Sequence, residues 1–285
     1  EERNSFEDLF TLMEHGHRIQ GGHGSGLIHY LVGTAAKGMA VYQLTNLVEK
    51  TTLPPQELLT FVSRFDAHRA NPGFISNVVK LEHRLNVQIL TEMSGGQFVG
   101  TTNSAPVRTI TKVGMQPFFS HAKSKETFAR LSRLALASSD QVYADMPIIP
   151  ELQKLTASTN RETTKLLLSG NAIGQIFTSM IFPAYDSFFV RKCNEDSLLS
   201  AAQTMFALRT FKDQHGRLPE KLEELVPHYL PALPRDGFDG KPLKYSAEKR
   251  ILYSVGKDLV DSGGVEKTEQ SRKGERLDIL FPIPF

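Results

Sequence analysis

Residues 233–242 read Leu-Pro-Arg-Asp-Gly-Phe-Asp-Gly-Lys-Pro, and this stretch decides the predicted fold of the C-terminal region. Its prolines and glycines are typical of turns, because glycine tolerates positive φ and proline fixes its own φ. Two short runs follow it, Leu-Lys-Tyr-Ser at 243–246 and Ile-Leu-Tyr-Ser at 251–254, and a polar turn separates them. Such runs predict two paired strands. The tail is therefore predicted to be a small α+β module with a short antiparallel sheet.

Upstream of this tail the dominant pattern is helical, because apolar residues recur at steps of three and four. Gly216 follows the last periodic residues before the tail and is predicted to cap a helix there. The fold class is thus mainly α, with a helical domain at 1–195 and an α+β domain at 196–285. The predicted helices are 4–19, 27–49, 55–66, 72–93, 121–138, 161–168, 172–182, 196–214 and 219–226, with a loop at 96–116 and a last strand at 276–281.

The composition is that of an ordinary globular protein. The chain has 285 residues, of which 40% are hydrophobic and 22% charged, and its formal net charge is +2. That balance gives no reason to expect a nucleic-acid partner. A basic group on one predicted helix has a spacing that favours a solvated helix face over the alternative, a phosphate-binding site. Its members are Lys123, Lys125, Arg130 and Arg133.

Two apolar segments, 26–48 and 172–190, were compared with the requirements for a membrane span. Polar residues interrupt the first, and Pro183 and Asp186 interrupt the second. A span needs about 20 mostly apolar residues, so both segments are predicted to be core. Residue 1 is Glu rather than Met, and we expect a leader or membrane anchor to precede it in the natural chain. The predicted location is the cell envelope or periplasm, with membrane contact only through that missing segment.

The order of elements in the tail resembles the globular domain of major pseudopilins of type II secretion systems. The matching pieces are the Gly-Arg-Leu-Pro segment at 216–219, the turn at 233–242, the segment 253–256, the acidic loop after it and the Asp-Ile pair at 278–279. The resemblance covers residues 196–285. A helical region stands where that family has its assembly helix, so polymerisation into a filament is not expected. The layout of the whole chain resembles uncharacterised bacterial proteins of planctomycete-like lineages, which implies no activity.

The resemblance implies a structural calcium site in the acidic loop. Asp258, Asp261 and Asp278 would supply carboxylates, and carbonyls around Leu259 and Ser262 would complete the shell, because Ca²⁺ takes 6–8 oxygen ligands. The alternative is a solvated loop whose acidic side chains offset nearby basic residues.

Four histidines near the N-terminus form the second candidate metal site. His15, His17, His23 and His29 surround a glycine-rich turn, and neutral imidazoles bind zinc or copper. The sequence has no His-Glu-x-x-His motif there. The alternative is that these histidines are exposed loop or capping residues.

No catalytic or cofactor-binding residue is predicted. Glu82, His83 and Arg84 follow one another within a helix, where adjacent positions point in different directions. Cys193 is the only cysteine, which excludes an internal disulfide, and it has no base partner in the sequence. The sequence favours a non-enzymatic, envelope-associated structural or interaction protein with an unidentified protein partner and a possible link to secretion. A metal-dependent enzyme or metal-binding protein using the histidines is the alternative.

Overall fold

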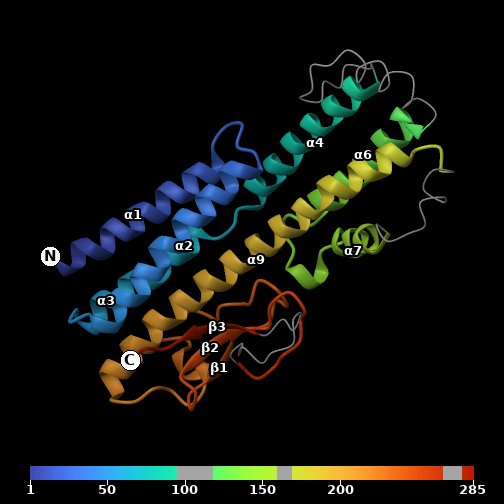
Figure 1. Ribbon diagram of the computed structural model, residues 1–285. Coiled ribbons are helices and arrows are strands. Elements are labelled where there is room, and N and C mark those ends of the chain that lie inside the picture. The colour runs from blue at the N-terminus through green and yellow to red at the C-terminus, as the bar shows by residue number, and fades with distance from the viewer. Residues whose placement is uncertain (95–117, 159–168, 266–277) are drawn as a thin grey trace. The chain divides into compact units, whose positions relative to one another are not determined.

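The computed structural model describes residues 1–94, 118–158, 169–265 and 278–285 (Figure 1). These residues divide into two compact units. The first comprises Glu1–Asn71, Val142–Asp145 and Phe189–Phe285, and the second comprises Pro72–Gln141 and Met146–Phe188. The predicted loop at 96–116, the predicted helix at 161–168 and the start of the predicted last strand lie outside the described residues.

The first unit contains the N-terminal helices, the C-terminal half of a long helix and a small sheet. The helix α9 runs over Ala172–His215, and its residues from Phe189 onward belong to this unit. The other elements are α1 (Glu2–Gly21), α2 (Leu27–Lys50), α3 (Pro55–Val62), the 3-10 helices η1 (Ser63–His68), η3 (Tyr143–Asp145) and η4 (Leu222–Leu225), and strands β1 (Lys244–Ser246), β2 (Ile251–Ser254) and β3 (Ile279–Pro282).

The three strands form an antiparallel sheet in the order β1-β2-β3. Tyr245 pairs with Leu252, and Leu252 pairs in turn with Phe281. Gly216 ends α9 with a φ of 70° and donates its N–H to the carbonyl of Lys212. The predicted fold class, mainly α with a short antiparallel sheet, is confirmed. The helix predicted at 219–226 is shorter, since only η4 forms there.

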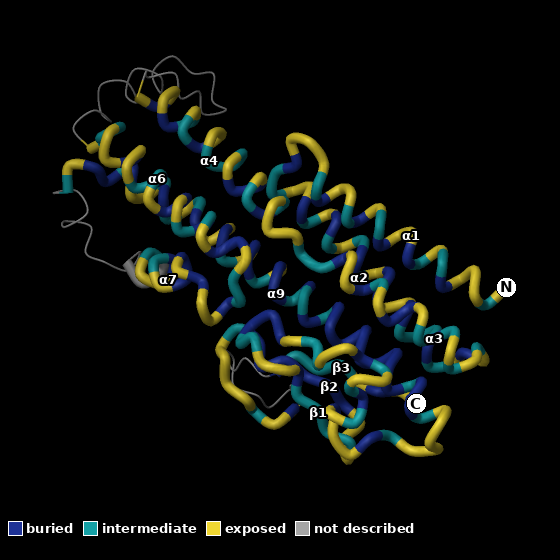
Figure 2. Tube along the Cα trace, turned by 180° about the vertical axis from the view of Figure 1, so that it is seen from behind, coloured by how far each residue is buried: buried dark blue, intermediate teal, exposed yellow. Residues whose placement is uncertain are grey.

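One hydrophobic core joins the N-terminal helices to the tail. Residues 199–208 of α9 are all buried, so this part of the helix is covered on every side (Figure 2). Phe6, Phe61 and Phe206 stack and cross in the middle, with ring centroids 5.2–6.4 Å apart. The same cluster includes Leu252 and Phe285 from the tail. The boundary near residue 195, drawn where the helical pattern gives way to the α+β tail, stays a prediction.

The second unit is helical in its described residues. Its helices are α4 (Pro72–Ser94), α6 (His121–Ala137), α7 (Ile149–Ser158) and the first part of α9. Ser120 caps α6, because its side chain accepts the N–H of Lys123. Phe128 packs against Phe182, which stacks on Tyr185, with ring centroids 5.1 and 5.0 Å apart.

The sequence predicted separate helices at 172–182 and 196–214, and this division was wrong. The helix α9 continues through Pro183 without a break. A proline inside a helix removes one backbone hydrogen bond and crowds the preceding turn. Here its ring is exposed, where water can satisfy the freed carbonyl, while Phe182 and Tyr185 beside it are buried in an aromatic cluster. Packing of these neighbours outweighs the local preference of proline.

Candidate functional site: the groove between α2 and α9

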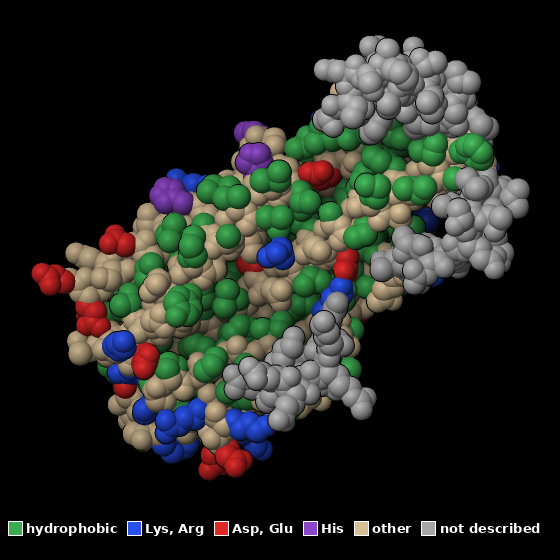
Figure 3. Space-filling model, in the orientation of Figure 1, with side chains coloured by type: hydrophobic (Ala, Val, Ile, Leu, Met, Phe, Trp, Pro, Cys, Tyr) green, Lys and Arg blue, Asp and Glu red, His purple; other side chains and the backbone are tan. Residues whose placement is uncertain are grey.

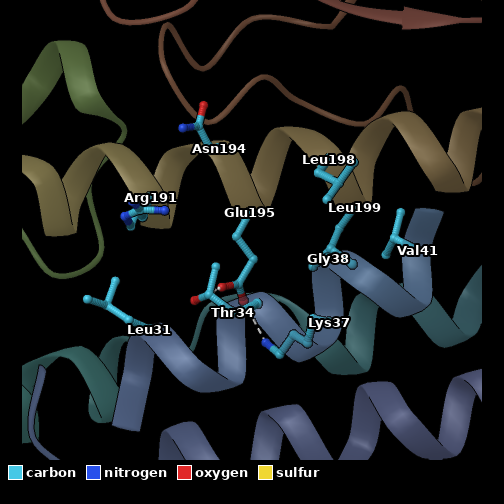
Figure 4. A pocket seen from close by; sticks show the side chains of 11 residues that line it. Leu31, Thr34, Lys37, Gly38, Val41, Arg191, Asn194, Glu195, Leu198 and Leu199 are labelled. Atoms are coloured by element: carbon cyan, nitrogen blue, oxygen red, sulfur yellow. Dashed lines mark hydrogen bonds and ion pairs between the residues drawn. The ribbon is translucent and has the colours of Figure 1, made fainter. Parts of the chain in front are cut away.

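A buried ion pair marks the contact between α2 and α9. The Nζ of Lys37 lies 2.6 Å from Oε1 of Glu195, and the two side chains are only 1% and 2% exposed. Figure 4 shows the two side chains pointing toward each other from facing helices. Isolated charges are very unfavourable in a dry interior, so their burial requires a partner and further hydrogen bonds.

Those further hydrogen bonds are present. Lys37 also donates to the carbonyl of His68 at 2.8 Å. The second carboxylate oxygen of Glu195 accepts from Nε2 of Gln20 at 2.8 Å and from Oγ1 of Thr34 at 2.6 Å. The pair therefore joins α1, α2, η1 and α9 through polar contacts that allow little change of register.

Two glycines let α1 and α2 approach closely enough to bring Gln20 to the pair. A Cβ on Gly33 would lie 2.4 Å from the carbonyl oxygen of Gly16 and 2.5 Å from Cγ of Gln20. A Cβ on Gly16 would lie 2.8 Å from the carbonyl oxygen of Gly33. Neither position has room for a larger residue, so the small side chains in the sequence set the spacing of these helices.

A groove of about 240 Å³ opens beside the pair. Figure 4 shows side chains from both helices around it. Its lining from α2 is Leu31, Thr34, Ala35, Lys37, Gly38 and Val41, and its lining from α9 is Arg191, Asn194, Glu195, Leu198 and Leu199. Most of this lining is apolar, and Lys37 and Glu195 are held by each other. The groove thus has the character of a recess for an apolar side chain.

An apolar stripe on α2 continues from this groove onto the surface. Ile28, Val32, Met39 and Tyr42 are 76, 52, 61 and 64% exposed, and Ala35 between them is exposed as well. We call these five residues the α2 stripe. They follow one another at steps of four, three, four and three, and none is charged. Figure 3 shows hydrophobic side chains gathered on this face. Exposed apolar patches of this kind mark interaction sites.

His68 lies beneath the ion pair in an environment that disfavours its charge. Its side chain is 7% exposed, and its Nδ1 lies 3.8 Å from a carboxylate oxygen of Glu14. Burial lowers the pKa of His68 to about 4, and the nearby His17 and Lys37 lower it further, while Glu14 opposes them. The imidazole is therefore neutral at neutral pH.

The four N-terminal histidines do not converge. His15, His23 and His29 are exposed, whereas His17 is half-buried with its ring 6.0 Å from that of His68. Within the described ranges no three His, Cys, Asp or Glu side chains gather closely enough to hold a metal ion. The sequence missed His68, because nothing in its local pattern indicates that residue 68 packs against α1.

The acidic loop is held by carboxylates that accept backbone N–H groups. Asp278 accepts from Ser262 at 3.2 Å and from Gly264 at 2.7 Å, so it fastens the loop to the residue before β3. Asp261 accepts from the N–H of Gly263, which lowers its pKa. Asp258 is exposed, and within the described residues its carboxylate accepts the N–H of Val260 two residues on. These carboxylates thus serve as local loop fasteners, and calcium binding stays a prediction.

Asp236, in the turn at 233–242, is a buried anchor that sequence reasoning did not identify. It is 2% exposed, and its carboxylate accepts from the hydroxyls of Ser197 and Ser254 at 2.8 Å each. It also accepts the backbone N–H groups of Phe238 and Val255 at 3.0 Å. The turn is therefore fixed to both α9 and β2.

Cys193 lies under this turn and is fully buried. Burial raises the pKa of its thiol to about 12, so the reactive thiolate is not formed at neutral pH. A Cβ on Gly237 would lie 2.4 Å from the carbonyl oxygen of Cys193, so the turn needs glycine at this point.

Comparison with family models, with curated proteins and with solved structures finds no match. The resemblance of the tail to pseudopilins therefore stays a prediction. Among the described helices, none combines the length and apolar character that crossing a bilayer requires.

Proposed function

We propose that this chain is a non-enzymatic, envelope-associated interaction protein that binds an α-helix of a partner protein along the α2 stripe. The observation that carries the proposal is the exposed series Ile28, Val32, Ala35, Met39 and Tyr42 at steps of four and three. That spacing averages 3.5 residues, which is the repeat by which two helices keep their apolar seams in contact.

The spacing favours a helix over other partners. A helix that lies along α2 places its own apolar side chains between successive stripe residues. The groove of about 240 Å³ beside the stripe offers a recess for one such side chain between Leu31 of α2 and Leu198 of α9. Because Lys37 and Glu195 are already paired, the partner needs no charge to complement them.

The envelope location and the link to secretion machinery rest on the sequence of the tail. Residues 196–285 resemble the globular domain of pseudopilins, and proteins of that class work outside the cytoplasm. In this proposal the tail is a folded support whose core is shared with α2, and α2 makes the contact.

Photo-crosslinking in the source organism tests the contact. A photoreactive residue at Met39 is expected to crosslink to a peptide of another protein that carries apolar residues at steps of three and four. The same residue at Gln43, which is exposed on the same helix outside the stripe, serves as the matched control. Val32→Glu is expected to remove the crosslink, and circular dichroism checks that the variant stays folded.

This proposal is contradicted by crosslinks from position 39 to a second copy of the chain, by crosslinks to lipid alone, or by equal crosslinking from both positions. A partner peptide without helical apolar spacing also contradicts it.

The calcium site is a second, smaller part of the proposal. Calcium bound by Asp258, Asp261 and Asp278 would stabilise the folded state, by about 2.7 kcal/mol when its concentration is a hundredfold above the dissociation constant. Thermal unfolding with calcium is expected to show a higher midpoint than with magnesium. Asp258→Asn is the decisive variant, because Asp258 is exposed and, among the described residues, its carboxylate makes a single local hydrogen bond. The calcium site is refuted if calcium does not raise the unfolding midpoint, or if the rise is as large in Asp258→Asn as in the wild type.

A further inference from the structure

A second groove lies between α4 and α6, which run side by side in the second unit (Figure 1). Its volume is about 500 Å³, within the range of small-molecule sites. We call it the cationic groove. Its lining from α4 is Val79, Lys80, His83 and Arg84, and its lining from α6 is Ala129, Ser132, Arg133 and Leu136.

The charged residues of this groove are all cations. Lys80, Arg84 and Arg133 are exposed, and no residue of the lining is acidic. Nowhere in the described part of the chain does a carboxylate pair with any of these three. By contrast Arg130, on the same helix α6, pairs with Glu151 at 2.7 Å. Three cations are thus gathered at one groove without a counter-charge.

A buried contact between the helices forms the base of the groove. The Nδ1 of His83 lies 2.9 Å from Oγ of Ser132, which is 5% exposed. Burial lowers the pKa of His83, and the charges of Arg133 and Lys125 lower it further. The exposed cations that line the groove give it a positive potential, which attracts an anion.

The remaining lining is apolar. Val79 is fully buried at the base, and the side chains of Ala129 and Leu136 are half-buried beside it. A bare inorganic anion would use the cations and leave the half-buried surfaces of Ala129 and Leu136 in contact with water. A ligand with an apolar part would cover them, which adds about 25 cal/mol per Å² of apolar surface removed from water.

We propose that the cationic groove binds a small amphipathic anion, a carboxylate or phosphate group carried on an apolar chain. Arg84 and Arg133, one from each helix, bind the anionic group, because guanidinium groups match carboxylate and phosphate oxygens in geometry and charge. Lys80 is exposed and adds a third positive charge, and the apolar chain lies on Ala129 and Leu136. This site is separate from the α2 stripe and does not depend on the function proposed for it.

Isothermal titration calorimetry of the full chain with octyl phosphate, kept below its micelle concentration, tests the site. We expect saturable binding at one site. Inorganic phosphate is expected to bind at least about tenfold more weakly, since it lacks the apolar chain. Octyltrimethylammonium has the same chain with a positive head and is expected not to bind.

Arg84→Gln and Arg133→Gln are each expected to weaken octyl phosphate binding about tenfold, the loss of roughly one charge-assisted contact. Arg130→Gln is the matched control, because Arg130 is exposed on the same helix and paired outside the groove. It is expected to leave binding unchanged. All three positions are exposed, so their variants keep the fold, and a melting curve verifies it.

The experiment also distinguishes a free amphipathic anion from an anionic membrane surface. Binding to vesicles of anionic phospholipid without binding to free octyl phosphate means a membrane surface and overturns the proposal. Equal affinity for inorganic phosphate and octyl phosphate refutes the claim that the apolar lining binds the chain of the ligand. Binding that all three arginine variants weaken equally shows a diffuse charge effect and overturns the site as a whole.

Discussion

The buried ion pair beside one groove and the exposed cations of the other are two opposite arrangements of charge. Beside the groove of the first unit, Lys37 and Glu195 are buried, paired at 2.6 Å and surrounded by further donors and acceptors. In the cationic groove of the second unit, Arg84 and Arg133 are exposed and have no described carboxylate partner. Paired charges hold helices in register, whereas unpaired charges gathered at a recess are available for a ligand. The difference separates residues that stabilise the fold from residues that bind.

Breaking the buried pair is expected to give the largest effect. Lys37→Met leaves the Glu195 carboxylate buried without its counter-charge, which costs about 3–5 kcal/mol of unfolding free energy. Chemical denaturation measures the change. The double variant Lys37→Met, Glu195→Leu removes both charges and is expected to recover much of the loss.

The exposed ion pair on α1 is the control for that experiment. Arg18→Ala breaks a pair with Glu14 whose side chains are 71% and 41% exposed. Exposed pairs contribute about 0.2–1 kcal/mol, so the change should be small. An equal loss in both variants would contradict the role of burial.

Lowering the pH protonates His68 and so adds a charge beside the buried pair of Lys37 and Glu195 without a mutation. The pKa of His68 is lowered to about 4 in the folded protein from an unfolded value near 6.5. The unfolded chain therefore binds the proton first as pH falls. Stability from the neutral imidazole is fully present above pH 6.5 and is lost as pH falls from 6.5 toward 4.

The expected loss over that window is about 2–3 kcal/mol, from 1.36 kcal/mol per unit of pKa difference. The free energy of unfolding, measured from pH 7 to pH 4, checks this value. His68→Leu is expected to lack the part of the pH dependence that comes from His68. His23→Gln, at an exposed position, should leave the profile unchanged. A wild-type profile identical to that of His68→Leu would refute the assignment.

The glycines that bring α1 against α2 provide the smallest of these structural effects. Gly33→Ala places a Cβ 2.4 Å from the carbonyl oxygen of Gly16, and overpacking of this kind costs about 1–3 kcal/mol. Gly38→Ala, on the same helix, meets nothing within 4 Å and should stabilise the helix by about 0.5–1 kcal/mol. If Gly33→Ala lowers the unfolding free energy and Gly38→Ala raises it, the close approach of α1 and α2 is supported. Changes of the same sign in both variants count against it.

The sequence predicted the fold better than the sites. Helical spacing identified α1, α2, α4 and α6 to within a few residues, because each pattern is local. Pro183 was misjudged, since the packing of Phe182 and Tyr185 that keeps α9 intact depends on residues far away in the chain.

The sites depend on such distant contacts. In the sequence, Lys37 is only one of the polar residues that interrupt the apolar segment 26–48. Its partner Glu195 lies 158 positions away. Arg133 was correctly predicted to lie on an exposed helix face. Only the fold shows that Arg84, from a different helix, lines the same groove.

Thermal unfolding with and without octyl phosphate tests the contrast between paired and unpaired charge most directly. It is measured on two variants: the double variant Arg84→Gln, Arg133→Gln in the cationic groove, and Lys37→Met in the buried ion pair. The account predicts that the groove variant melts at or slightly above the wild-type temperature and no longer responds to octyl phosphate. Lys37→Met should melt far below wild type yet still gain stability from the ligand. A groove variant that is as unstable as Lys37→Met, or that keeps the full response to octyl phosphate, would contradict the account.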